Sequence, residues 1–130
     1  MKATNAQAQL ASEALHELAR KEMAVGPALK VRKILTEISA QMKDVEDVRI
    51  ERLRHAAQVD ENGQVQANEN GEAVFKSDES RADFGTFYRE LMAAEQKYTH
   101  MLNVADLGNM QVRPGVLIAL GPWLADSEAE

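Results

Sequence analysis

A run of apolar residues with a 4-3-4-3 spacing constrains the fold of this chain more than any other feature. The run consists of Val31, Leu35, Ile38, Met42 and Val45. Such spacing places the side chains on one seam of a helix, as in coiled-coil-like packing. We expect a single helix over residues 27–58, roughly 45 Å long at 1.5 Å per residue. A helix of that length in a chain of 130 residues must span the whole domain or offer part of its seam to another copy or another protein.

Residues 5–24 predict the first helix. Asn5 can cap it by accepting a hydrogen bond from a backbone N–H. Leu10, Leu15 and Leu18 supply an apolar stripe at helical spacing. Pro27 then fits the first turn of the long helix, where its missing N–H costs nothing.

Residues 80–97 predict a third main helix. Ser80 followed by Asp83 resembles a weak capping box. Half of the aromatic side chains of the chain fall on one stripe of this helix: Phe84, Phe87 and Tyr88, with Leu91 and Met92. We expect this stripe to pack on the seam of the long helix.

The C-terminal part predicts one short helix over residues 114–120, opened by Pro114 and ended by Gly121. We expect residues 126–130 to form a loose tail.

A polar stretch over residues 59–77 predicts a small β-hairpin. It contains Asn62-Gly63 and Asn70-Gly71, and both residue types tolerate the positive φ of tight turns. Polar and apolar residues alternate around the second pair. Neither turn fits a calcium loop, because the leading carboxylate ligand is missing in both registers. We see no long internal repeat.

Together these segments predict one α+β domain over residues 1–130, predominantly helical, with three main helices, a small β-hairpin and a short C-terminal helix. A chain of this length buries enough surface to fold without a disulfide or a metal, and it contains no cysteine. The formal net charge of −6 argues against nucleic acid as a partner. The apolar runs are too short for a signal peptide or a membrane span.

No pattern in the sequence predicts chemistry. The three histidines, His16, His55 and His100, are widely separated and form no spaced metal pair. No glycine-rich phosphate loop is present, and no serine has an activating neighbour. We therefore expect a protein that is not an enzyme and that needs no cofactor or metal.

Two groups of residues are candidate partner surfaces. The first is basic and lies on the long helix; it is either a solvated face balanced by its own acids or a docking face for an acidic partner. Its members are Lys30, Arg32, Lys33, Arg49, Arg52 and Arg54. The second consists of Leu120, Trp123 and Leu124. It is either a lid on the core or an interface hot spot, in which tryptophan is enriched.

The whole pattern resembles a family of small tailed-bacteriophage proteins that have no assigned activity. The resemblance covers residues 8–124 and rests on generic motifs: the Val25-Gly26-Pro27 link into Lys33-Ile34-Leu35, the Asp60-Glu61-Asn62-Gly63 and Glu69-Asn70-Gly71 turns, Phe75, and the Asp106-Leu107, Val112 and Pro114 close. It implies a phage origin and transfers no role to any residue.

Three functions remain open at this stage. The first is a phage accessory protein that binds and modulates a host or phage protein in the host cytoplasm. The second is a virion component or assembly factor, for example at a tail or head–tail joint. The third is an enzyme whose site leaves no trace in residue spacing. Separately from these functions, the long helix is a candidate for self-association.

Overall fold

The computed structural model describes residues 1–108 and 110–125, and the predicted tail at 126–130 lies outside the described residues. The predominantly helical α+β class is confirmed. Where the sequence predicted a single domain, the chain forms two compact units. Unit 1 contains residues 1–42 and 95–130, and unit 2 contains residues 43–94.

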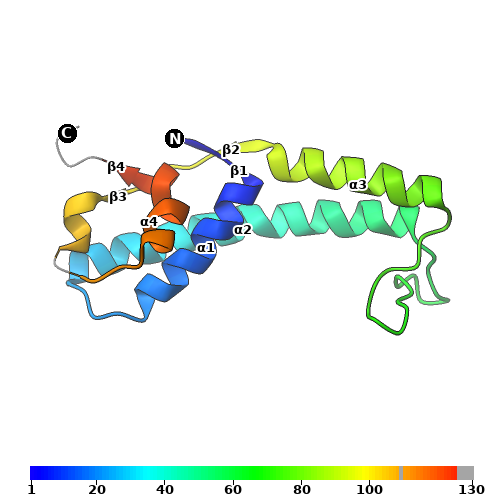
Figure 1. Cartoon of the computed structure of the whole chain (residues 1–130), viewed down its shortest axis with the longest axis horizontal. Helices are drawn as coiled ribbons and strands as arrows, with labels where there is room; N and C mark the ends of the chain where they lie inside the picture. The colour runs from blue at the N-terminus through cyan, green and yellow to red at the C-terminus, as the bar shows by residue number, and fades with distance from the viewer. Residues whose placement is uncertain (109, 126–130) are drawn as a thin grey trace. The chain divides into compact units, whose positions relative to one another are not determined.

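Unit 1 combines helices with two short strand pairs (Figure 1). Its N-terminal elements are β1 (Lys2–Thr4), α1 (Asn5–Ala19) and the first part of α2 (Val25–Ala56). Its C-terminal elements are β2 (Glu95–Lys97), β3 (Leu102–Asn103), the 3-10 turn η1 (Val104–Leu107), α4 (Pro114–Leu120), η2 (Gly121–Trp123) and β4 (Leu124–Ala125). Strand β1 pairs antiparallel with β2, and β3 pairs parallel with β4.

Thr4, and not the predicted Asn5, caps helix α1. Its side chain accepts a hydrogen bond from the Gln7 backbone N–H at 3.1 Å, and the Gln7 side chain accepts one from the Thr4 backbone N–H at 2.8 Å. This reciprocal arrangement is a capping box. Asn5 is buried, and its side-chain oxygen accepts a hydrogen bond from Gln96 in β2. Helix α1 then ends at Ala19, earlier than the predicted residue 24.

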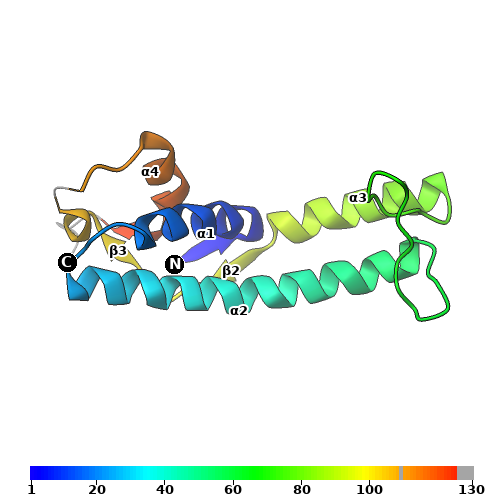
Figure 2. The same ribbon diagram turned by 90° about the horizontal axis from the view of Figure 1, so that it is seen from below.

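The core of unit 1 is mainly aliphatic and joins α1, α2 and α4. Leu15 and Leu18 of α1 are fully buried with Ile34 and Ile38 of α2. Helix α4 lies beside α1 in Figures 1 and 2 and contributes Leu120 to the same core. Leu10, which the sequence placed on the same stripe as Leu15, is 57% exposed.

Trp123 and Tyr98 close this core as an edge-to-face pair. Their ring centroids lie 5.1 Å apart, a separation at which such pairs add to the energy of burial. Trp123 is fully buried and Tyr98 nearly so. Burial raises the pKa of the Tyr98 hydroxyl, and the Glu37 carboxylate adds to the shift.

Unit 2 contains the last part of α2, a connecting segment and α3 (Asp78–Ala93). Ser77 caps α3 by accepting a hydrogen bond from the Ser80 N–H at 3.0 Å, so the helix begins before the predicted Ser80. It ends at Ala93, and residues 95–97, predicted as its last turn, form strand β2 of unit 1.

The expected packing of the aromatic stripe on the whole seam is wrong. The seam divides between the units, and its first part, including Val31 and Ile38, belongs to the core of unit 1. Within residues 43–94 only Val45 and Ala57 are buried, and no residue of α3 is. Phe87 of α3 is instead covered by the Arg52 guanidinium, 4.7 Å from its ring centroid.

The segment predicted as a hairpin forms two equal turns around a ring of three hydrogen bonds. Gln66 donates its backbone N–H to the Gln58 carbonyl, Val74 donates to Gln66, and Gln58 donates to Val74, at 2.8, 3.0 and 2.8 Å. Single bridges join the neighbouring residues in pairs: Ala57 with Phe75, Val59 with Val65, and Ala67 with Ala73.

The two turns repeat each other eight residues apart. Asp60 in the first turn and Asn68 in the second each accept, through the side-chain oxygen, two backbone N–H groups at 2.9 and 3.0 Å. Gly63 and Gly71 then take positive φ values of 75° and 78°. The sequence analysis missed this short repeat, which is Glu-Asn-Gly in both copies.

Replacing Leu15 by Ala should destabilise the protein by about 2–5 kcal/mol, because it leaves a cavity in the core. The matched change Leu10→Ala on the exposed face of α1 should stay within about 0.5 kcal/mol. Urea denaturation followed by circular dichroism measures both free energies of unfolding. Equal losses for the two variants would contradict the assignment of the core.

Replacing Gly63 or Gly71 by Ala should each cost about 1 kcal/mol or more, because an L side chain is strained at these φ values. Gly26→Ala serves as the control, because Gly26 lies in α2, has no positive φ and leaves open space for a Cβ. Thermal melts that show no difference between the turn variants and Gly26→Ala would count against the turn geometry.

Candidate protein-binding groove

An open groove of about 690 Å³ runs between α1 and the first part of α2, within unit 1. Its α1 side and the following link contribute His16, Ala19, Lys21, Glu22 and Met23. Its α2 side contributes Ala28, Val31, Arg32, Leu35, Thr36 and Ser39. All described lining residues therefore come from two consecutive helices and their link.

The α2 side of the groove is one continuous helical face. Its residues follow an i, i+3, i+4, i+7, i+8, i+11 spacing, which places them on one side of a helix. Val31 is buried at the base, Leu35 and Met23 are half-buried, and Ala28 is small. The base of the groove is therefore apolar, as is common in grooves that receive a helix or a loop of another protein.

Exposed cations flank this apolar base. Lys21 lies on the link and Arg32 on α2, and both are exposed. Within the described residues, the Arg32 guanidinium takes part in no ion pair. One carboxylate, Glu22, also lines the groove. Residues 1–42 and 95–125 contain eight Lys or Arg and six Asp or Glu, so this part of an acidic chain is slightly basic.

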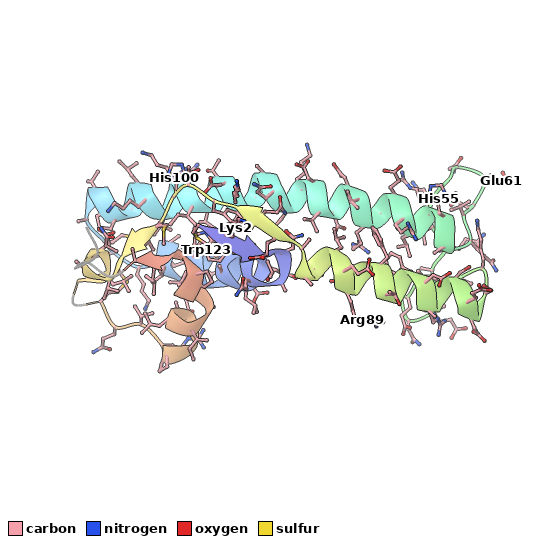
Figure 3. The ribbon with its side chains drawn as sticks, turned by 90° about the horizontal axis from the view of Figure 1, so that it is seen from above. Lys2, His55, Glu61, Arg89, His100 and Trp123 are labelled. Carbon is pink, nitrogen blue, oxygen red and sulfur yellow. The ribbon has the colours of Figure 1, made fainter. Side chains whose placement is uncertain are left out.

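A second, shallower hollow of about 340 Å³ borders the groove across α2. Arg32 and Thr36 line both hollows, and Lys33 and His100 line only the second. Figure 3 shows His100 on the segment that crosses over this part of α2. The basic face of α2 thus continues from the groove to His100.

Glu37 fixes that crossing segment to α2. Its carboxylate accepts hydrogen bonds from the Thr99 backbone N–H at 2.9 Å, from the Thr99 hydroxyl and from the His100 N–H at 3.2 Å. Partial burial opposes ionisation, but these hydrogen bonds outweigh it and lower the pKa of the Glu37 carboxyl. Glu37 therefore positions His100 beside Lys33.

Two ion pairs hold other parts of unit 1 together. Lys30 contacts Asp106 of η1 at 3.0 Å, and Arg113 contacts Glu17 of α1 at 2.8 Å. Burial raises the pKa of Asp106, but the Asn103 N–H and Lys30 outweigh it, so the pKa is lowered. The hydrogen bond from Arg113 likewise lowers the pKa of Glu17.

The structure separates the residues predicted as a basic docking face. Lys30 is paired with Asp106, and Arg49 with Glu46 at 2.5 Å. Arg52 covers the Phe87 ring, and Arg54 is exposed in unit 2. Lys33 and Arg32 lie in unit 1 beside the groove, and Arg49, Arg52 and Arg54 belong to unit 2.

The predicted apolar patch at the C-terminal end belongs to the core. Leu120 and Trp123 are fully buried, and Leu124 is half-buried against the same core. Trp123 therefore lies in the core, in agreement with the first of its two predicted alternatives. An interface hot spot needs an accessible side chain, which neither Leu120 nor Trp123 offers in this structure.

Sequence reasoning missed the α1 side of the groove. His16 and Met23 carried no pattern that pointed to binding, because their partners on α2 are separated from them by a chain reversal. The one sequence feature that could have indicated the groove is the small size of Ala19 and Ala28, which line it from α1 and α2. Larger side chains at these two positions would fill the space.

The described residues offer little for other kinds of site. Among them, no cluster of three or more His, Asp or Glu side chains is arranged to hold a metal ion. Within residues 1–108 and 110–125, no helix combines the length and apolar character needed to cross a bilayer.

Glu37→Gln should destabilise the protein by about 1 kcal/mol at neutral pH, because one charged acceptor of several hydrogen bonds is lost. Because folding lowers the pKa of Glu37, its contribution is present above the unfolded value near 4.5 and disappears as the pH falls through the folded pKa. The difference in unfolding free energy between wild type and variant should therefore shrink in acid.

Glu13→Gln is the control for that measurement, because Glu13 is exposed on α1. Denaturation curves between pH 3 and 7, an interval that brackets the ordinary carboxyl range of about 4, test the assignment. A stability difference that stays constant across that range would contradict it.

Comparison with known proteins gives no match: no family model, no curated protein and no solved structure is similar to this chain.

Proposed function

We propose that this chain is a phage accessory protein that acts by binding another protein, with no catalytic step. The groove between α1 and α2 carries the proposal. It combines an apolar base with cationic residues at its edge, a combination that suits an inserted helix face or loop. The phage origin rests on the resemblance of the sequence pattern.

The polar groups of the groove support binding over chemistry. The Thr36 hydroxyl donates to the Arg32 carbonyl at 2.9 Å, and His16 contacts the Ser12 carbonyl through Nδ1 at 2.7 Å. A nucleophile needs a base within hydrogen-bond reach, and these two side chains hydrogen-bond backbone groups of their own helices.

The carboxyl groups with altered pKa values support the same conclusion. The pKa values of Glu17, Glu37 and Asp106 are all lowered. A general acid at neutral pH needs the opposite shift, because it must keep its proton. Each lowered value follows from a contact that joins two segments of unit 1, which is a structural role.

The first candidate role is modulation of a host or phage protein in the host cytoplasm. A second candidate is a virion component or assembly factor. The second is favoured by one observation: acidic residues are concentrated in one stretch of the chain, whereas exposed Lys21 and Arg32 line the groove. Residues 57–80 contain six acids and one Lys, whereas the described part of unit 1 is slightly basic.

Affinity purification from infected cells with mass spectrometry tests the groove as the binding surface. Ala28→Trp fills the groove from an exposed position, so the fold should survive. Ala82→Trp makes the same change at an exposed site on α3. We expect Ala28→Trp to reduce recovery of the partner by about ten-fold or more, which corresponds to at least about 1.4 kcal/mol.

Circular dichroism of both Trp variants confirms that each is folded before the comparison. Recovery of the same proteins by wild type, Ala28→Trp and Ala82→Trp would show that the groove is not the binding surface. Detection of the chain in purified virions would select the second role.

A further inference from the structure

We infer that the groove of one copy binds the acidic connecting segment, residues 57–77, of a second copy. This inference rests on the proposed function of the groove and names its occupant. It joins two different surfaces, so the contact is head-to-tail: it closes into a ring or continues as an open chain, depending on the rotation between copies.

The charge of the connecting segment selects it as the occupant. Its acids are Asp60, Glu61, Glu69 and Glu72, and its one base is Lys76, which gives it a net charge of −3. Residues 43–56 of α2 contain equal numbers of acids and bases. Helix α3 begins with Asp78 and Glu79 and has a net charge of −2. The negative charge of unit 2 is thus concentrated in the connecting segment and the start of α3.

The two turns present these carboxylates outward. Glu61 and Glu69 are exposed, and within the described residues neither takes part in an ion pair. Figure 3 shows Glu61 at the outer part of the loop that follows α2. The ring of backbone hydrogen bonds through Gln58 and Gln66 holds both turns in place, so little order has to be gained on binding.

The groove offers both parts of the complementary surface. Arg32 and Lys21 face the solvent at its edge, and Met23, Val31 and Leu35 form its base. Val59 precedes Asp60 in the first turn and is 41% exposed, so an apolar side chain stands beside the carboxylates. A single exposed ion pair contributes only about 0–1 kcal/mol, and burial of Val59 adds the apolar part of the contact.

Charge also decides against the symmetric alternative. In a symmetric dimer that brought the connecting segments of two copies together, two acidic segments would meet and repel each other. Contact between the acidic segment and Lys21 and Arg32 of another copy avoids that repulsion and places opposite charges together.

Analytical ultracentrifugation tests the inference with two variants. Lys21→Glu with Arg32→Glu inactivates the groove, and Glu61→Lys with Glu69→Lys inactivates the acidic segment. We expect the wild type to associate at low salt at about 0.5 mM, and its dissociation constant to rise about ten-fold or more in 0.5 M salt. Each double variant alone should sediment as a monomer of 14.4 kDa.

Mixing the two double variants is the decisive step. One has an intact acidic segment and the other an intact groove, and the two reversed surfaces are also opposite in charge, so an equal mixture should associate again. Lys2→Glu with Lys97→Glu changes the net charge equally on exposed residues that line neither the groove nor the hollow beside it. This control should still associate, with its dissociation constant raised less than about three-fold.

Three results would overturn the inference: a monomeric wild type, association that persists in both double variants, or a mixture that stays monomeric. A monomeric wild type whose cellular partner is still lost by Ala28→Trp would retain the groove as a binding surface and assign its occupant to a different protein. A monomeric wild type together with unchanged recovery of the cellular partner by Ala28→Trp would remove the proposed function as well.

Discussion

Burial of one aliphatic face of α2 against α1 determines the rest of unit 1. Ile34 and Ile38 meet Leu15 and Leu18 in a core that excludes solvent completely. With this face buried, the neighbouring face that contains Ala28, Arg32 and Leu35 lies at the edge of the contact, where the two helices leave a groove. One helix thus supplies both the core and the candidate binding surface.

Polar contacts then hold the C-terminal half of unit 1 on this helical pair. Glu37 binds the segment at Thr99 and His100, and Lys30 binds Asp106. Because both contacts start from exposed or half-exposed positions of α2, each contributes modestly, and their main effect is to fix which segment lies where. The second hollow beside Arg32 exists because Glu37 holds His100 over α2.

The sequence predicted where helices begin and end better than it predicted which face of a helix is buried. The spacing from Val31 to Val45 and the position of Pro27 indicated α2 within about two residues at each end, since helix periodicity and capping are local. Leu10 and Leu15 occupied one predicted stripe, yet only Leu15 is buried, because burial depends on where α4 and the strands pack. Long-range contacts of this kind leave no periodic signal.

The candidate site was predictable only in part. Arg32 and Lys33 were recognised as basic residues of α2. Arg32 lies near His16 and Met23 only because the chain reverses between α1 and α2. Both basic residues lie near His100 only because the segment that contains it crosses α2. Trp123 was a candidate for both core and surface, and only the tertiary packing distinguishes the two. The paired turns were visible as two Asn-Gly pairs, whereas the ring of hydrogen bonds that unites them was not.

Methyl NMR spectra recorded as the protein concentration is raised test most directly whether the groove is where this chain meets its partner. Met23 reports on the groove and Met92 on α3 of unit 2, and both side chains are half-buried. The account predicts that the Met23 methyl signal shifts and broadens with concentration while the Met92 signal stays in place. A Met23 signal that stays constant while Met92 shifts would contradict it.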